Sequence, residues 1–314
     1  MRFGWVGFHA EALPALDALL TAKAPIAGVL TLAPALAAAR SGGADFAPVC
    51  ARHGVPLHPI SDVNGAEAQQ LLQAMSPDVV FVIGWHQIVR PASLCIARMG
   101  MIGAHASLLP HNRGSAPINW AIINGESKTG NTLFWLTESV DAGQIIDQVE
   151  FPITPYDTCA TLYQHVASSN REMLLRVLPR LLAGERPGRP QPVTDEPTLR
   201  RRRPADGVID WSLSSRRLYD FMRALAKPYP GAFATLDGRT WRVWDAALLP
   251  NGRAGAPGQI IGPVVSPRAE ACGQVVACGE GSLVLLELEG EDGTILKGRA
   301  LSDQAWTGKH FAHV

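Results

Sequence analysis

The sequence predicts an α/β fold in which a Rossmann-like, mostly parallel sheet with helices on both faces precedes a small C-terminal open β-barrel of the OB-like kind. Short apolar segments alternate with helix-like segments over residues 1–83, which is typical of a parallel sheet covered by helices. Short strand-like segments separated by Gly, Pro and Asp-Gly turns follow a helix-like segment at 211–225, and this spacing predicts a small barrel. The 314 residues suit two domains of roughly 100–200 residues each.

The N-terminal half supplies the elements of the parallel sheet. Leucines recur at helical spacing within residues 11–20, directly after the apolar segment 1–8, so the chain opens as strand, turn and helix. The expected strands are 1–8, 26–32, 54–57, 79–83, 101–105 and 133–136, and the expected helices are 11–20, 46–53 and 66–75. In such a sheet the functional site lies in the loops that follow the strands. The turn at 7–9 has too few glycines for the GxGxxG loop of a dinucleotide site.

A break in composition separates the two domains. Residues 184–204 contain five prolines and six arginines and show no apolar periodicity. We expect a catalytic domain at 1–183, a linker at 184–205 and a barrel-like domain at 206–314, with strands at 231–236, 240–244, 258–261, 274–278 and 283–288. The run of arginines at 200–203 is either a nucleic-acid contact or a solvated stretch balanced by Asp195 and Glu196, and we favour the solvated stretch.

Composition argues against several classes of protein. The 28 Lys and Arg balance 28 Asp and Glu, and the mean hydropathy is +0.07, which favours neither a polyanion-binding surface nor a membrane protein. Every apolar run is far shorter than the roughly 18 residues of a spanning helix, and the N-terminus lacks a signal pattern, so we expect a cytoplasmic protein. The five cysteines are scattered without a CxxC pair, so we expect reduced thiols and no metal site.

The segment 105–145 concentrates residues that carry chemistry. His105 ends an expected strand, and the loop from Pro110 to Pro117 is too rich in Gly and Pro for regular structure; its Arg113 is suited to hold an anionic group. Asp141 lies in a turn after the strand 133–136, so we expect it to meet His105 at the carboxyl ends of two strands of one sheet. A carboxylate there orients an imidazole for general acid–base chemistry, although a lone His with a distant Asp is more often structural than catalytic.

The complete pattern of motifs resembles a known family. The strings HASLLPxxRGxxP at 105–117, GExxTGxT at 125–132 and DxGxI at 141–145 resemble the signature of the folate-dependent formyltransferases. That family includes methionyl-tRNA formyltransferase and the N-formyltransferases of nucleotide-linked amino sugars. Segments 203–211 and 223–233 are similar to the start of the family's C-terminal domain, so the resemblance covers nearly the whole chain.

The resemblance implies a donor, a reaction and a set of site residues. The donor is 10-formyltetrahydrofolate, and a primary amine attacks its formyl carbon to give a formamide and tetrahydrofolate. His105 is the implied proton-transfer group, and Asp141 is the carboxylate that supports it. The folate is implied to lie against two segments, which comprise His86, Gln87 and Ile88 in one and Thr137, Glu138, Ser139 and Val140 in the other. For the acceptor we expect contacts with His9, which follows the first strand, and with Ser107 and Arg113.

One position departs from the family pattern. The family has Asn two residues before its catalytic His, where it donates a hydrogen bond to the oxyanion, whereas this sequence has Gly103. Loss of such a donor costs on the order of 10²–10³ in rate. Another donor therefore substitutes for it, or turnover is slow, or the chemistry has changed. The candidates for a substitute donor are the Gly103 N–H, His86, Gln87 and Asn112. Ser115 stands where some sugar-modifying relatives have an Arg that contacts the folate, which leaves the strength of donor binding open.

The charge of the catalytic domain bears on the acceptor. Residues 1–183 contain 11 Lys and Arg against 13 Asp and Glu, whereas gripping a tRNA needs several cations on one face. The segment 33–45, where tRNA-type relatives carry a basic insertion, offers only Arg40. The segments 119–122, 228–233 and 291–298 are closer to the amino-sugar branch, such as the UDP-4-amino-4-deoxy-L-arabinose formyltransferases. We therefore expect a small-molecule amine acceptor, most simply a nucleotide sugar, and no nucleic-acid or membrane partner.

Two alternative functions stay open at this point. In one, the chain is a methionyl-tRNA formyltransferase with an unusual surface, and in the other it is a folate-binding homologue whose chemistry changed with Gly103. The sequence also leaves the oligomeric state open, and a homodimer is one of the choices.

Overall fold

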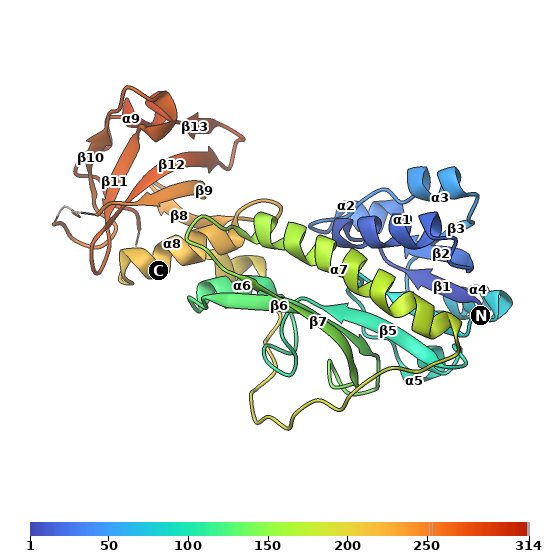
Figure 1. Cartoon of the computed structure of the whole chain (residues 1–314). Helices are drawn as coiled ribbons and strands as arrows, with labels where there is room; N and C mark the ends of the chain where they lie inside the picture. The colour runs from blue at the N-terminus through green and yellow to red at the C-terminus, as the bar shows by residue number, and fades with distance from the viewer. Residues whose placement is uncertain (251, 253, 313–314) are drawn as a thin grey trace. The chain divides into compact units, whose positions relative to one another are not determined.

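The computed structural model describes residues 1–250, 252 and 254–312, which form two compact units. Unit 1 comprises 1–118, 127–153 and 161–201, and unit 2 comprises 119–126, 154–160 and 202–314. The division is not a single cut along the chain, because two short segments from the first half belong to unit 2. Figure 1 shows the elements of both units. No helix in the described ranges has the length and apolar character needed to cross a membrane.

Unit 1 is built on a seven-stranded sheet of order β3-β2-β1-β4-β5-β6-β7. Its strands are β1 (Phe3–Val6), β2 (Ile26–Leu32), β3 (Leu57–Ile60), β4 (Val79–Val82), β5 (Gly100–His105), β6 (Lys128–Trp135) and β7 (Ile145–Pro152). The first five strands pair in parallel, whereas β6 and β7 pair antiparallel. The predicted mostly parallel sheet is therefore confirmed. Because the strand order reverses between β1 and β4, the loops after these two strands flank the switch point where α/β sheets bind ligands.

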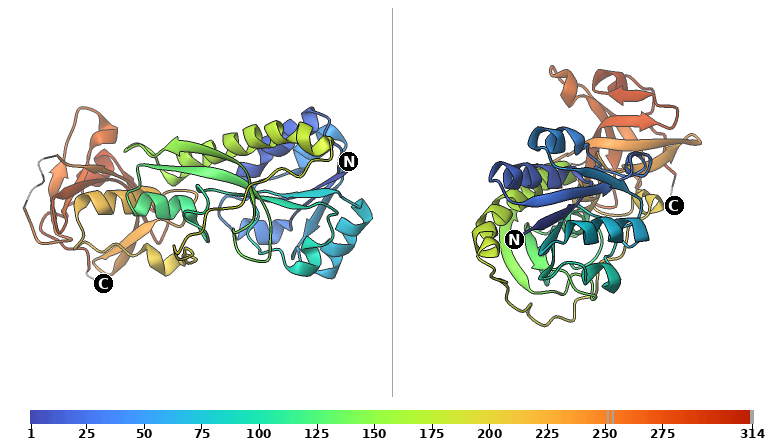
Figure 2. Two further views of the ribbon diagram at one scale, coloured as in Figure 1. Left: turned by 60° about the horizontal axis from the view of Figure 1, so that its bottom comes forward. Right: turned by 90° about the vertical axis from the view of Figure 1, so that its right-hand side faces the viewer.

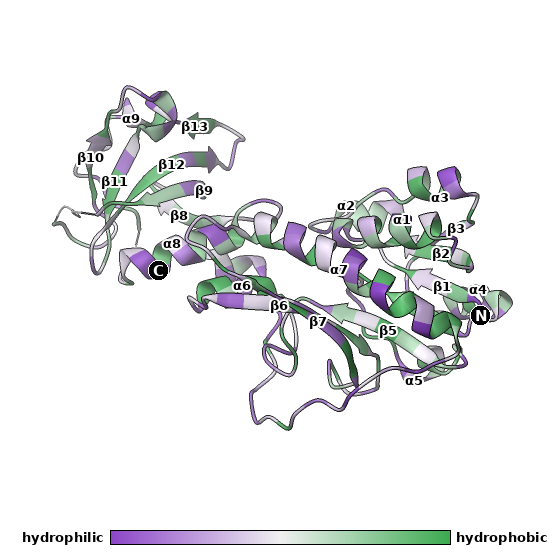
Figure 3. Cartoon of the chain, viewed as in Figure 1, coloured by the Kyte–Doolittle hydropathy of each residue, from purple (hydrophilic) through white to green (hydrophobic). Residues whose placement is uncertain are grey.

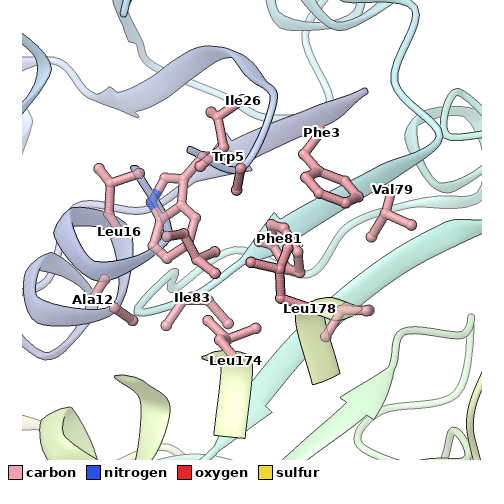
Figure 4. Packing of buried hydrophobic residues seen from close by; sticks show 14 of the residues in the cluster. Phe3, Trp5, Ala12, Leu16, Ile26, Val79, Phe81, Ile83, Leu174 and Leu178 are labelled. Atoms are coloured by element: carbon pink, nitrogen blue, oxygen red, sulfur yellow. The ribbon is translucent and has the colours of Figure 1, made fainter. Parts of the chain in front are cut away.

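Alternation along the central strands divides the core into two layers. Phe3 and Trp5 of β1 and Phe81 of β4 pack against one set of helices, whereas Val6 and Val82 point to the opposite face. Figure 4 shows Trp5 enclosed by residues from both neighbouring strands and helices. Both faces are buried, so the strands are apolar at nearly every position, as expected for a parallel sheet.

Helices cover both faces of this sheet (Figure 2). The helices of unit 1 are α1 (Leu13–Thr21), α2 (Pro34–Ala38), α3 (Ala47–His53), α4 (Ala66–Met75), α5 (Pro91–Leu94) and α7 (Cys159–Leu182, from Thr161 onward in this unit). The Phe3 layer contains residues of α1, α3 and α7, and the Val6 layer contains residues of α4 and the segment after α5. Sequence periodicity did not identify α7 or β7.

Unit 2 is a six-stranded antiparallel sheet with its own core, in agreement with the predicted C-terminal domain. Its strands are β8 (Ala232–Leu236), β9 (Arg239–Leu248), β10 (Ile260–Val264), β11 (Gly273–Ala277), β12 (Ser282–Gly290) and β13 (Ile295–Lys297), and its helices are α6 (Pro117–Ile123, from Asn119 onward), α8 (Ser215–Leu225) and α9 (Arg299–Ser302). Near the chain end, Phe311 bridges to Leu236 of β8 and His310 bridges to Gln259 before β10. This stretch joins the two edge strands and curls the sheet. Figure 3 shows hydrophobic residues along its strands.

Side chains of α8 hold the two early segments inside unit 2. Arg223 is buried beside Asp220 at 2.7 Å and donates to the carbonyl oxygens of Thr154 (2.9 Å) and Asp157 (2.5 Å). Asn119 Nδ2 donates to Ala224 O at 2.6 Å. A buried guanidinium that meets a carboxylate and two carbonyls has its charge and its donors satisfied together.

Candidate active site

His105 and Asp141 meet in unit 1. The Nδ1 atom of His105 lies 3.5 Å from Asp141 Oδ2, and the two side chains are only 9% and 18% exposed. The other ring nitrogen, Nε2, lies 2.8 Å from the carbonyl oxygen of Asn112. Both neighbours of the imidazole are acceptors, so the doubly protonated ring has a partner for each N–H. Polar groups of the protein therefore hold both ring nitrogens of His105.

Asp141 reaches His105 by a different route from the one we expected. We expected both residues at the carboxyl ends of two strands of one sheet, but β6 runs antiparallel to β5, with Trp135 opposite Ile102, so these two ends do not lie at the same edge. Thr132 lies opposite His105, and β6 then continues for three more residues to Trp135. The carboxyl end of β6 is thus about 10 Å away from His105, at ~3.3 Å per residue. The turn after β6 makes up this distance by folding back, and Leu136 N donates to Met101 O at 2.8 Å where it begins. The two residues meet as expected, but they do so because the turn after β6 folds back, and not because two strands end at the same edge of the sheet.

Hydrogen bonds support both loops that meet at the pair. Gly114 N donates to Asp141 Oδ2 at 2.9 Å, so the carboxylate contacts the loop after β5 as well as the imidazole. Thr132 Oγ1 donates to Ser107 O at 2.6 Å and accepts from Leu109 N at 3.1 Å, which fixes the start of that loop. These contacts give a physical reason for the threonine that ends the GExxTGxT motif.

Residues in the left-handed region mark the same two loops. Asn112, Ala116 and Asp141 have φ values of 55°, 56° and 51°. Non-glycine residues adopt this region at a cost and concentrate at functional sites, where the surrounding structure holds them. Asn112 was considered from sequence only as an oxyanion donor, and the structure adds a contact through its main-chain carbonyl.

The space beside Gly103 is filled by an apolar side chain. Gly103 and His105 point to the same face of β5, because side chains alternate along a strand. A Cβ atom added at Gly103 lies 2.5 Å from Leu136 Cδ2 and 3.3 Å from Leu136 Cγ. An Asn at this position therefore requires Leu136 to move. The Leu136 side chain therefore occupies the space where the family pattern places the side chain of an Asn.

The loops after β1 and β4 form a second set of polar and aromatic groups at the switch point. His9 Nδ1 lies 3.3 Å from Glu11 Oε2, and the His9 ring contacts the Tyr163 ring at 5.3 Å. The His86 ring meets the rings of Phe8 and Trp85 at 5.1 and 5.4 Å. Partial desolvation of the ring, reinforced by the positive charges of Arg40 and Arg201, lowers the pKa of His86 to about 4, although the residue as a whole is exposed. His86 is therefore neutral at pH 7.

The segments expected at the folate differ in how their side chains are used. The amide of Gln87 donates one of its two hydrogens to Ser61 O at 2.9 Å and accepts from Val63 N at 2.9 Å, so its side chain anchors the loop. Ile88 is 64% exposed. Thr137 Oγ1 donates to Ser139 O at 3.1 Å within the second segment, where Glu138 and Val140 are also exposed.

Two residues expected at the acceptor take different places. Ser107 is fully buried, and its hydroxyl donates to His111 O at 2.7 Å, so this side chain supports the loop and we remove it from the acceptor site. Arg113 has a buried Nε atom that makes no hydrogen bond within the described part of the chain. Its main-chain oxygen accepts from Leu199 N at 2.6 Å. Within the same described part, no three His, Cys, Asp or Glu side chains gather as a metal site needs.

Unit 1 is thus a doubly wound α/β domain that holds a buried His–Asp pair beside one of its strand ends. The family profile described as Formyl transferase matches residues 33–178, and the profile described as Formyl transferase, C-terminal domain, matches residues 202–305. The chain therefore belongs to the formyl transferase family.

Solved structures share this fold at low sequence identity. HypX from Aquifex aeolicus in complex with tetrahydrofolic acid has a TM-score of 0.66 at 16% identity, over 95% of this chain and 46% of that chain. This chain thus spans about half the length of HypX. WlaRD, a sugar 3N-formyl transferase with dTDP and 5-N-formyl-THF, has a TM-score of 0.63 at 15% identity, over 94% and 99% of the chains. The N-formyltransferase from Helicobacter canadensis with folinic acid and dTDP-3-aminofucose has a TM-score of 0.62 at 17% identity, over 91% and 98%.

Proposed function

We propose that the protein transfers a formyl group from 10-formyltetrahydrofolate to the primary amine of a nucleotide-linked amino sugar. The observation that carries the proposal is the buried pair of His105 and Asp141, at 3.5 Å, in a member of the formyl transferase family. Folate binding is supported by the structures of HypX, WlaRD and the Helicobacter canadensis enzyme, which each contain a folate derivative. In this chain the folate lies along 86–88 and 137–140.

His105 moves the proton in this reaction. The acceptor nitrogen attacks the formyl carbon, the bond from that carbon to the folate nitrogen breaks, and one proton passes from the acceptor nitrogen to the folate nitrogen. His105 accepts and returns this proton, and Asp141 stabilises the imidazolium in between. The Gly114 N–H holds the carboxylate in place. With Leu136 beside Gly103, the oxyanion takes its hydrogen bonds from main-chain N–H groups or from neutral His86.

The choice of acceptor rests on charge and on the neighbours. Residues 1–183 carry two more acidic than basic side chains, which disfavours a grip on tRNA phosphates. WlaRD was solved with dTDP, and the Helicobacter canadensis enzyme with dTDP-3-aminofucose. His9, Glu11 and Arg113 lie in the loops after β1 and β5, where an acceptor with amine and phosphate groups finds polar partners.

The test is a screen of acceptors against 10-formyltetrahydrofolate, read by mass spectrometry. The panel contains UDP-4-amino-4-deoxy-L-arabinose, dTDP-3-aminofucose, simple amines and charged initiator methionyl-tRNA. We expect a formyl mass gain on an amino-sugar nucleotide, abolished in Asp141→Asn. Formylation of the tRNA alone, with binding that weakens steeply as salt rises, identifies the tRNA enzyme instead. Tight folate binding with no formamide on any acceptor identifies a folate-binding homologue without formyl transfer.

A further inference from the structure

The segment after α7, which the sequence indicated as an extended linker, contacts the loops of the candidate active site in unit 1. Residues 186–201, which we call the strap, contain no helix and no named strand (Figure 1). Hydrogen bonds nevertheless hold the strap to unit 1. Arg189 and Ile145 exchange two N–H···O bonds of 2.8 Å after the Asp141 turn, and at the other end Leu199 N donates to Arg113 O while Ser115 N donates to Leu199 O.

Gln191, in the middle of the strap, binds the turn that carries Asp141. Its Nε2 atom donates to Asp141 O at 2.7 Å and to Gly143 O at 2.8 Å, so both amide hydrogens are used on one turn. The turn is tightly packed, because a Cβ atom added at Gly143 collides with Trp135 O. Asp141 itself is held in the left-handed region, at φ 51°. Two hydrogen bonds from one rigid amide fix the direction in which the Asp141 side chain leaves this strained turn.

We propose that Gln191 is a positioning residue that holds the Asp141 carboxylate against His105, an inference that rests on the function proposed above. The strap acts on both sides of the pair, since its far end pairs with the loop whose Gly114 N–H donates to Asp141 Oδ2. Without the amide, the carbonyl oxygens of Asp141 and Gly143 lose their shared donor. The turn then relaxes, and the carboxylate leaves both Gly114 and the imidazole.

The first measurement needs no acceptor. Amide hydrogen exchange at Gly114 reports whether the Asp141 carboxylate is in place, because this N–H donates to it. In Gln191→Ala we expect exchange at Gly114 to accelerate at least 10-fold, as in Asp141→Ala. The matched control is Val193→Ala, on the same strap at a side chain that is 99% exposed, and it leaves the exchange unchanged. Unchanged Gly114 exchange in Gln191→Ala overturns the inference.

The second measurement is turnover of 10-formyltetrahydrofolate with UDP-4-amino-4-deoxy-L-arabinose. We expect Gln191→Ala to lower kcat at least 10-fold while KM for either substrate changes less than 2-fold. Gln191→Glu, whose ionised carboxylate faces two carbonyl oxygens, is at least as slow at pH 8 and recovers partly as the added carboxyl is protonated at low pH. A rise in KM with unchanged kcat overturns the positioning role.

A double variant separates this inference from the proposed function. If Gln191 acts through Asp141, adding Gln191→Ala to Asp141→Asn lowers kcat less than 2-fold further, and full additivity overturns the inference. Failure of the proposed function has a different signature, in which Asp141→Asn keeps wild-type turnover or the acceptor is not formylated at all. In that case Gly114 exchange still decides whether Gln191 positions the carboxylate.

Discussion

Two histidine–carboxylate pairs occupy the same stretch of unit 1, and their contact lengths run opposite to their proposed importance. His111 Nδ1 lies 2.7 Å from Glu196 Oε2, but both side chains are about half exposed, at 50% and 49%. His105 and Asp141 are 3.5 Å apart and largely buried. Water screens the shorter pair, whereas the longer one is enclosed by a main-chain carbonyl, a main-chain N–H and the strap. The surroundings of a pair, and not its contact length, thus identify the proposed catalytic site.

The largest effects are expected at the enclosed pair. His105→Ala removes the proposed proton carrier, and Asp141→Asn removes the charge proposed to stabilise its protonated form, so we expect each to lower kcat by 10²-fold or more. Circular dichroism and thermal unfolding show whether the fold stays intact. Near-wild-type turnover in either folded variant contradicts the assigned role.

A smaller effect is expected when the family amide is restored beside the pair. Gly103→Asn drives its side chain into Leu136, so the free energy of unfolding falls by about 1–3 kcal/mol. Adding Leu136→Ala gives the amide room, and turnover then rises above that of Leu136→Ala alone because an oxyanion donor has been gained. Denaturant titration and initial rates measure the two effects. If turnover does not rise, another donor already serves the oxyanion.

The pKa of His86 is lower than that of a histidine side chain in solution, which makes the stability of the protein depend on pH. Its pKa is lowered to about 4, so the folded protein keeps the ring neutral while the unfolded chain protonates it near pH 6.5. As the pH falls from about 6.5 to 4, the free energy of unfolding therefore decreases, because the unfolded chain binds a proton that the folded protein does not. Below about pH 4 this decrease is complete, and above about pH 7 His86 causes no change. NMR of the ring carbon measures the midpoint, and Arg40→Gln moves it upward. A midpoint near 6.5 contradicts the predicted environment.

The smallest effect is expected at the exposed pair. Glu196→Gln removes the carboxylate that contacts the half-exposed His111 ring, so the free energy of unfolding changes by less than about 1 kcal/mol and kcat by less than 2-fold. Thermal unfolding and initial rates check this at low and high salt. A loss of turnover comparable with that of Asp141→Asn removes the contrast between the two pairs.

Sequence patterns predicted elements whose signal is local. The strands β1, β2 and β4 are short apolar runs, and each was placed within a few residues because two buried faces leave little room for polar side chains. The helix α7 was missed because its apolar positions are diluted by polar residues along much of its length (Figure 3). The direction of β6 was also missed, since pairing direction depends on partners far along the chain.

The residues of the candidate site show the same distinction: sequence motifs indicated some of them, and only contacts in the folded protein indicated the others. His105 and Asp141 were identified through motif resemblance, whereas the strand argument offered for their meeting was wrong. The sequence did not indicate Gln191 as a site residue. It lies in a segment without periodicity, and its side chain contacts main-chain carbonyl groups, which leave no pattern in the sequence. Leu136 likewise gained meaning only from its distance to Gly103.

The way α8 gathers segments 119–126 and 154–160 has a consequence for protein engineering. A chimera that exchanges everything after residue 201 with a relative separates Arg223 and Ala224 from their partners at Thr154, Asp157 and Asn119. The retained part then keeps the carbonyl groups of Thr154 and Asp157 and the side-chain amide of Asn119 without the α8 groups to which they are hydrogen-bonded. Grafting of the C-terminal unit therefore requires three pieces of sequence, and evolution by simple tail exchange meets the same barrier.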